Sequence, residues 1–379
     1  MRRCARCRPS PPPRARFLFA FAGGSGHAEP LVPLARAAAA AGHVVALTGR
    51  PSALDPELEL DVFPTGTDRP PRRRPLRVVG VEREQRAFRK GFAGWVARER
   101  ADAVLALCAE WRPDLLVCDE TDYGAMVAAE RLGLPHAIVL VTAAGFVRRE
   151  LVAEPLEALR AAHGLPPDPE LAMIGRDLVL SPFPPSLRDP AGAECFRPPT
   201  GEAAPHEGTP TVYFTLGTVF NLESGDLFAR ALAGLRSLDV DVVATVGRQI
   251  DPKELGPQPD RIRVERYLPH SVVLPRCDAV VSHGGSGSVL GALAHGLPSV
   301  LLPMGADQPL NAARCEELRV ALVLDAGRAT PDDVREAVSA VLEDPSYRVA
   351  AERVRDEIRG LRGPEHALRL LERLVETDD

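Results

Sequence analysis

Residues 277–311 constrain the fold of this chain more strongly than any other stretch of the sequence. A short apolar run at 279–282 leads into the glycine-rich HGGSGS at 283–288, and helix-favouring residues follow up to a glycine and a proline. A second apolar run, 299–303, begins after that proline. Glycine and proline end helices, and short apolar runs between turns are typical of buried strands. The predicted order is therefore strand, turn, helix, strand, which is the repeating unit of an open parallel α/β sheet.

The HGGSGS turn is suited to holding an anion. Glycines have no Cβ atom to keep a ligand away from the backbone, and the N-terminus of the next helix offers free N–H groups and a partial positive charge. A diphosphate fits such a site. The second strand brings Asp307 and Gln308 to the same edge of the sheet, where open α/β sheets bind ligands. The alternative is a turn that only packs, with His283 as a buried histidine.

The combined pattern, His283-Gly-Gly-Ser-Gly-Ser288 with Gly296-x-Pro298, Asp307-Gln308 and Asn311, resembles the donor-binding signature of the inverting nucleotide-sugar glycosyltransferases of family 1. It is most similar to actinobacterial members that glycosylate antibiotics and other natural products. The resemblance implies the GT-B fold, an α/β architecture of two doubly wound Rossmann-like domains that face each other across a cleft. It also implies a metal-independent glycosyltransferase of the hexosyltransferase type, with a nucleotide-sugar as co-substrate and no cofactor.

The resemblance also assigns roles to residues of the donor site. In the family, the histidine and the small hydroxyl residues of the turn hold the diphosphate, and the Asp-Gln pair hydrogen-bonds hydroxyls of the sugar. Gly217 and Thr218 resemble a second diphosphate contact, after a strand predicted at 211–216. Tyr267 stands where an aromatic ring stacks on the pyrimidine, beside the Leu268 backbone; a core tyrosine is the alternative. The implied donor-binding residues are Gly217, Thr218, Tyr267, Leu268, His283, Gly285, Ser286, Gly287, Ser288, Asp307 and Gln308.

A parallel sheet is also predicted in the N-terminal half. Residues 17–22 have the apolar character of a buried strand, the alanine-rich 34–41 favours a helix, and 43–47 predicts the next strand. These three elements make a βαβ unit. Its glycines do not match the NAD or FAD fingerprint, because Glu29 stands at the third glycine and no carboxylate follows the second strand.

The motif Gly26-His27-x-x-Pro30, after the first strand, is similar to the family motif that carries the general base. A neutral imidazole can take a proton from an alcohol near pH 7 if a neighbouring group orients it. Asp119, at the end of a predicted strand, is the candidate for that group, and the family's aspartate at this position has that role. Glu120 and Asp122 leave the choice of carboxylate open, and any of the three alternatively caps the next helix. For His27, too, the alternative is a capping residue.

Length and composition favour two domains. A chain of 379 residues exceeds the roughly 250 residues at which a single core stops growing. The proline- and glycine-rich 198–210 predicts a linker between them. The crossing of the last helix back to the first domain is implied by the resemblance. The predicted parts are a disordered basic arm at 1–16, an acceptor-binding domain at 17–200, a donor-binding domain at 201–362 and a terminal helix at 363–379.

Charge and cysteine content narrow the partners and the compartment. A net charge of −6 favours neither nucleic acid nor an anionic membrane surface, and no run reaches the ~20 apolar residues of a membrane span. Seven scattered cysteines argue against a disulfide framework and predict the cytoplasm. Cys4 and Cys7 form a CxxC pair without a second pair, which argues against a zinc site. The oligomeric state, including a homodimer, is left open.

The predicted function is inverting transfer of a sugar or deoxysugar to a hydroxyl of a small hydrophobic natural product, with His27 as base, in antibiotic biosynthesis and secondary metabolism. The sequence favours a dTDP-sugar over a UDP-sugar, because Gly291 stands where many family members with uridine donors have a glutamate for the ribose hydroxyls. Two alternatives are a nucleotide-sugar epimerase on the same fold and a non-catalytic auxiliary nucleotide-binding subunit. The identities of the sugar and the acceptor do not follow from the sequence.

Overall fold

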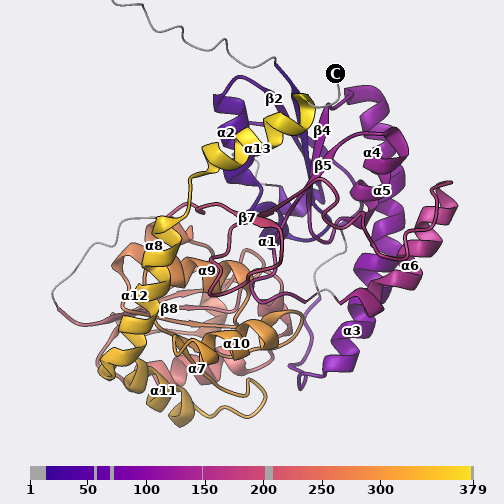
Figure 1. The fold of residues 1–379 in the computed structure, drawn as a ribbon. Helices are drawn as coiled ribbons and strands as arrows, with labels where there is room; N and C mark the ends of the chain where they lie inside the picture. The colour runs from indigo at the N-terminus through magenta and orange to yellow at the C-terminus, as the bar shows by residue number, and fades with distance from the viewer. Residues whose placement is uncertain (1–13, 55–57, 69–71, 147, 201–207, 377–379) are drawn as a thin grey trace, which may run out of the picture.

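The structure, a computed structural model, describes residues 14–54, 58–68, 72–146, 148–200 and 208–376. It contains two parallel sheets, one in each half of the chain (Figure 1). The predicted fold class, two doubly wound α/β halves, is confirmed. Residues 1–13, which hold Cys4, Cys7 and most of the predicted arm, and residues 201–207 of the predicted linker lie outside the described ranges.

The first sheet has seven parallel strands in the order β3-β2-β1-β4-β5-β6-β7. Its strands are β1 Arg16–Ala20, β2 Val44–Gly49, β3 Asp61–Pro64, β4 Leu115–Asp119, β5 His136–Val139, β6 Leu178–Ser181 and β7 Ala193–Cys195. Its helices are α1 Ser25–Ala28, α2 Val32–Ala40, α3 Val81–Lys90, the π-helical turn η2 Gly91–Val96, α4 Ala97–Trp111, α5 Tyr123–Leu132 and α6 Arg149–Ala162, with the short 3₁₀ turn η1 Pro51–Ala53.

The second sheet has six parallel strands in the order β10-β9-β8-β11-β12-β13. Its strands are β8 Thr211–Thr215, β9 Asp241–Thr245, β10 Ile262–Glu265, β11 Ala279–Ser282, β12 Ser299–Leu301 and β13 Ala321–Val323. Its helices and short turns are η3 Phe220–Glu223, α7 Leu227–Arg236, η4 Pro252–Leu255, α8 His270–Val273, η5 Leu274–Arg276, α9 Ser286–Ala294, α10 Gln308–Glu317, α11 Pro331–Glu343 and α12 Pro345–Gly360. The last helix, α13 Pro364–Glu376, follows α12.

The sheets are buried on both faces, as the apolar character of their strands requires. In β1, Phe17 and Phe19 point into one hydrophobic cluster, and Leu18 and Ala20 point into another on the opposite face. Successive strand residues face opposite sides, so a strand covered on both sides needs an unbroken apolar run. In each half the strand order reverses beside the first strand, between β1 and β4 and between β8 and β11. Ligands of doubly wound sheets bind at the carboxyl ends of the strands at such a reversal.

The chain crosses between the halves a second time at its C-terminal end. Helix α13, yellow in Figure 1, lies on the first half and packs against α2. Its residues Leu368 and Leu371 are buried in the cluster that also holds Phe17 and Phe19. The two crossings touch, because the Arg197 backbone N–H, after β7, donates to the Arg362 carbonyl, before α13, at 2.7 Å.

Several predicted elements differ from the observed ones. Strand β1 starts at Arg16 rather than at residue 17, and Ala15, expected in the disordered arm, is buried. His27, placed by the sequence after the first strand, lies within the short helix α1. Residues 50–98, for which the sequence predicts no element, contain β3, α3 and η2. No helix within the described ranges is both long and apolar enough to cross a membrane.

We expect Leu371→Ala to lower the free energy of unfolding by about 2–5 kcal/mol, because it leaves a cavity between α13 and the first sheet. The exposed Arg369→Ala on the same helix should change it by less than about 0.5 kcal/mol. Urea denaturation followed by circular dichroism measures both variants. Equal effects of the two substitutions would contradict the docking of α13.

Candidate active site

His27 lies at the reversal point of the first sheet, just beyond the carboxyl end of β1. Its side chain is 22% exposed, and its ring stacks on Phe92 of η2, with centroids 5.2 Å apart and planes 16° apart. Gly23 makes room for this ring, since a Cβ atom at that position would lie 2.0 Å from His27 Cδ2. Stacking on one side and a bare glycine on the other restrict the orientation of the imidazole.

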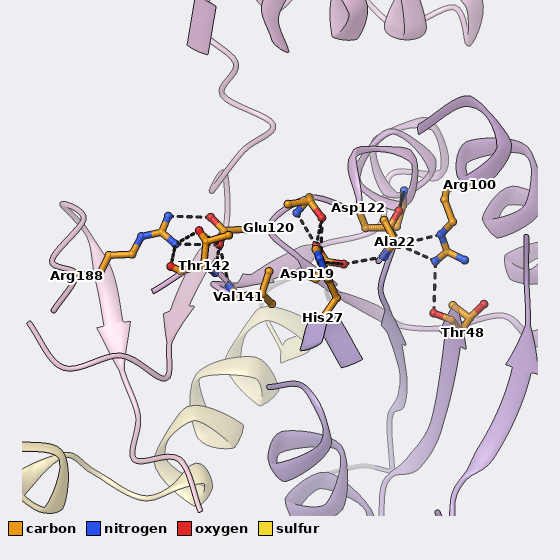
Figure 2. Close-up of polar contacts among 12 residues, drawn as sticks. Ala22, His27, Thr48, Arg100, Asp119, Glu120, Asp122, Val141, Thr142 and Arg188 are labelled. Carbon is orange, nitrogen blue, oxygen red and sulfur yellow. Dashed lines mark hydrogen bonds and ion pairs between the residues drawn. The ribbon is translucent and has the colours of Figure 1, made fainter. Parts of the chain in front are cut away.

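Asp119 lies at the end of β4, the strand beside β1, and is fully buried. Its Oδ2 is 3.4 Å from His27 Nδ1 and accepts the Ala22 N–H at 2.7 Å. Its Oδ1 accepts the N–H and the hydroxyl of Thr121, both at 2.6 Å, and that hydroxyl is 3.2 Å from His27 Nδ1 (Figure 2). A buried carboxylate is stable only with such partners. With Nδ1 engaged, Nε2 is the nitrogen left to exchange a proton with a substrate.

The pair shifts both pKa values in the direction expected for an imidazole held by a carboxylate. Burial alone would lower the pKa of His27, but the charge and hydrogen bond of Asp119 outweigh it, so this pKa is raised above 6.5. Burial would raise the pKa of Asp119, but His27 and the hydrogen bonds of Thr121 and Ala22 lower it below its ordinary value. The arrangement therefore favours an imidazolium beside a carboxylate.

The other two carboxylates of the motif have different partners, so the geometry resolves the choice that the sequence left open. Glu120 accepts two hydrogen bonds from Arg188, at 2.8 Å each, together with the N–H groups of residues 141 and 142. Asp122 caps α5 by accepting the Ala125 N–H and pairs with the buried Arg100 at 2.6 Å. Figure 2 shows these as separate networks on either side of Asp119. Of the three, only Asp119 is paired with His27 in the described structure.

The reversal point of the second sheet carries the predicted diphosphate residues. Thr218, which follows β8, touches Ser25 of α1 through their hydroxyls at 3.2 Å, so the two reversal points face each other. The His283 ring lies between Gly217 and Gly285, where added Cβ atoms would approach it to 2.6 and 2.4 Å. Burial lowers the pKa of His283 to about 4, which makes it a neutral imidazole at pH 7. Its Nδ1 is buried without a hydrogen-bond partner among the described residues.

Ser286, at the start of α9, joins the two halves. Its hydroxyl donates to Asp307 Oδ2 at 2.6 Å and accepts the backbone N–H of Ala143, from the first half, at 2.6 Å. Asn311, fully buried, donates to Asp307 Oδ2 at 2.8 Å and accepts the N–H of Ala144 at 2.9 Å. The donor-site residues are thus fixed by contacts from the opposite half.

The remaining predicted donor residues lie in different environments. Gln308 is 1% exposed, and its Oε1 accepts the backbone N–H groups of residues 304 and 305, so it holds the loop in place. Gly287 is exposed and Ser288 half-buried on the first turn of α9. Tyr267 is 40% exposed beneath the Arg248 guanidinium, 4.5 Å from its ring, and the half-buried Leu268 packs against a small hydrophobic cluster.

The sequence did not indicate Gly23, Phe92 or Thr121 as parts of the site. Thr121 stands inside the motif that holds Asp119, and its spacing of two residues from the carboxylate suits a local hydrogen bond. Phe92 lies in the stretch without predicted elements, and only the fold brings it to His27.

We expect Asp119→Asn to lower the pKa of His27. Burial disfavours the charged imidazole, and the substitution removes the charge and hydrogen bond of Asp119 that oppose it. NMR titration of the His27 ring measures this pKa. Asp102→Asn, which changes an exposed carboxylate 3.8 Å from His163, serves as the control and should leave it unchanged. An unchanged pKa in Asp119→Asn would contradict the pairing.

Known proteins with the same organisation are sugar transferases. The family model "Erythromycin biosynthesis protein CIII-like, C-terminal domain" matches residues 229–374. The chain is 32% identical to 4'-demethylrebeccamycin synthase from Lentzea aerocolonigenes, over 95% of this chain and 100% of that protein. It is 30% identical to 10-deoxymethynolide desosaminyltransferase from Streptomyces venezuelae, over 92% and 94%.

The fold is also that of solved glycosyltransferases. The crystal structure of glycosyltransferase VinC in complex with dTDP matches with a TM-score of 0.72 and 25% sequence identity, over 96% of this chain and 100% of that one. Both sheets are therefore included in the match. The chain belongs to the GT-B glycosyltransferases of antibiotic and natural-product biosynthesis.

Proposed function

We propose that this glycosyltransferase moves a sugar from dTDP to a hydroxyl of a natural-product acceptor, with inversion at the anomeric carbon and with His27 as the general base. The observation that carries the proposal is the His27–Asp119 pair at the reversal point of one sheet. Helix α1, which holds His27, contacts Thr218 at the reversal point of the other sheet, after the strand that pairs with β11. A base and an anion-binding turn on opposite halves suit a reaction that joins two substrates.

In the proposed step, His27 Nε2 takes the proton of the acceptor hydroxyl while its oxygen attacks the anomeric carbon. The bond from that carbon to the diphosphate oxygen breaks on the opposite face, so the configuration inverts and the bonding electrons leave with the diphosphate. Asp119 stabilises the imidazolium that forms. Because protonation of His27 removes the base, and because Asp119 raises the pKa at which this happens, activity should fall as the pH falls.

The leaving diphosphate would lie at the N-terminus of α9, against His283 and the turn that runs from Gly285 to Ser288. As a neutral imidazole, His283 would contribute a hydrogen bond rather than a charge. The helix N-terminus and the open backbone N–H groups would stabilise the negative charge, which makes a metal ion unnecessary for this step. Gly217 and Thr218 would add the second contact, and Asp307 would face the sugar on the loop that Gln308 holds through its Oε1.

The donor nucleotide is proposed to be dTDP because Gly291 offers no side chain to a ribose 2'-hydroxyl. A Cβ atom at this position would lie 3.0 Å from His270 Nδ1 and 3.1 Å from Leu274 Cδ1, so the glycine also makes room for His270. Burial lowers the pKa of His270 to about 4, which leaves a neutral ring where a carboxylate would otherwise bind the ribose. The structurally similar VinC was crystallised with dTDP. The relative 10-deoxymethynolide desosaminyltransferase is named as a transferase, which disfavours the epimerase alternative.

We expect His27→Ala to reduce transfer by about 100-fold or more, because the acceptor hydroxyl loses its base. Product formation from a dTDP-sugar and an acceptor found by screening natural-product aglycones measures this. The affinity for dTDP should stay within about twofold, and His163→Ala, which changes a histidine far along the chain at the end of α6, should stay active. In the unaltered enzyme kcat/KM should fall with decreasing pH through a pKa above 6.5. Retained transfer in His27→Ala would contradict its role as base.

We expect dTDP to raise the thermal stability of the protein more than UDP at the same concentration. A ligand at a hundredfold its Kd stabilises the folded state by about 2.7 kcal/mol. A melting scan with each nucleotide measures the difference, and dTMP tests the contribution of the second phosphate. Equal shifts for dTDP and UDP would contradict the argument from Gly291.

A further inference from the structure

One segment of the first half lies against the second half beside the proposed sugar site. The Arg74 backbone N–H donates to the Leu222 carbonyl of η3 at 2.8 Å, and the Arg74 side chain pairs with Glu223 at 3.4 Å. Leu76 packs against the hydrophobic core of the second half. A Cβ atom at Gly225 would lie 2.9 Å from the Leu76 nitrogen, so this contact is close-packed. Helix α3 begins at Val81, five residues after Leu76.

Glu84 of α3 reaches the loop that carries Asp307. Its Oε2 accepts the backbone N–H of Ala306 at 3.2 Å, and its Oε1 accepts two hydrogen bonds from Arg83, at 3.0 and 3.1 Å. The side chain of Glu84 is 18% exposed. A charge-assisted hydrogen bond to a backbone N–H at a largely covered position is among the stronger contacts between two surfaces.

The loop needs this support because its backbone is strained. Ala306 has a φ of +52°, a left-handed conformation that residues with a Cβ atom rarely adopt. Gly305, before it, is enclosed on two sides, since an added Cβ atom would lie 3.1 Å from both Glu84 Oε2 and Phe220 Cε1. Asp307 follows directly and is the residue before α10. The orientation of Asp307 therefore depends on a peptide that Glu84 holds.

The same helix leads to the catalytic base. Helix α3 continues without a break into η2, where Phe92 stacks on His27 and Phe88 stacks on Phe92 with centroids 5.3 Å apart. The continuous helix formed by α3 and η2 therefore makes two contacts: Glu84 binds Ala306 of the second half, and Phe92 stacks on His27 of the first half. In Figure 1, α3 lies at the side of the second half, away from the first sheet.

We infer that Glu84 is a positioning residue for the donor sugar: a carboxylate of the acceptor half that holds the Ala306 peptide in its left-handed conformation and so sets Asp307 toward the sugar. This inference rests on the proposed function, because it takes Asp307 as the residue that faces the sugar. It assigns to the first half a part of the donor site that the sequence motif places wholly in the second half.

The test separates the sugar from the nucleotide. Glu84→Ala should raise the KM for the dTDP-sugar about tenfold, the loss expected for one hydrogen bond, while the Kd for dTDP stays within about twofold. Glu84→Gln, which keeps an acceptor oxygen, should restore most of this loss. Glu82→Ala, in an exposed pair with Arg86 on the same helix, is the matched control and should behave like the unaltered protein.

Amide hydrogen exchange gives a readout that needs no substrate. Exchange of peptides covering 303–310 should be faster in Glu84→Ala and unchanged in Glu82→Ala. Glu84→Ala and Asp307→Ala combined should lose less than the product of their separate effects on the KM of the sugar donor, since both act through one contact.

Three results would overturn the inference. They are unchanged exchange and KM in Glu84→Ala, equal loss of dTDP and dTDP-sugar affinity in that variant, and multiplicative effects in the double variant. If Asp307→Ala changes neither the KM for the dTDP-sugar nor the Kd for dTDP, Asp307 does not contact the sugar, and both that part of the proposed function and this inference are wrong. If Asp307→Ala raises the KM for the dTDP-sugar and Glu84→Ala does not, only the inference about Glu84 is wrong.

Discussion

The buried negative charge of Asp119 is the interaction on which the arrangement of the first half depends. A carboxylate with no exposed surface costs several kcal/mol unless each oxygen is satisfied. Its partners come from the chain after β1 and from the chain after β4, so they meet only when those two strands pair in parallel. Fold and chemistry share this requirement, because the same pairing that satisfies the carboxylate holds the imidazole beside it.

The second half differs from the first, because not every buried polar atom in its candidate site has a hydrogen-bond partner within the described residues. His283 is enclosed by two glycine backbones, and its Nδ1 has no partner among the described residues. Ser286 and Asp307, in contrast, are tied to each other and to the first half. Residues proposed to face the phosphates and residues that contact the first half therefore alternate along the turn at 283–288 and α10. In the proposed function, donor binding and contact between the halves would depend on the same few side chains.

Much of the fold follows from the sequence because its strands are buried on both sides. Apolar runs such as 17–22 and 279–282 could be read directly, and strands β1 and β11 lie in these runs. Strand β3 and helix α3 could not be read, because β3 is a short, half-exposed edge strand and α3 has one buried apolar residue. Their positions are decided by contacts with distant segments, which a local pattern does not contain.

The residues of the candidate site that belong to a sequence motif could be predicted. The residues that reach the site only through packing could not be predicted in full. His27 and Asp119 lie together as predicted, although the prediction could not choose among the carboxylates after β4. Gln308 was expected to face the sugar, yet both of the contacts that its oxygen makes are to its own loop. Phe92 and Glu84 could be identified only from the structure, because Phe92 contacts His27 and Glu84 contacts Ala306, which are both distant in the sequence.

The contact between Arg197 and Arg362 has a mechanical consequence. The polypeptide passes between the halves twice, and these passages are bonded to each other. Two separate tethers at distant points would clamp the halves rigidly, whereas two adjoining ones act as a single pivot. A rotation about this pivot that separates the halves would also have to break the contacts that Leu222, Ser286 and Asn311 make with the first half.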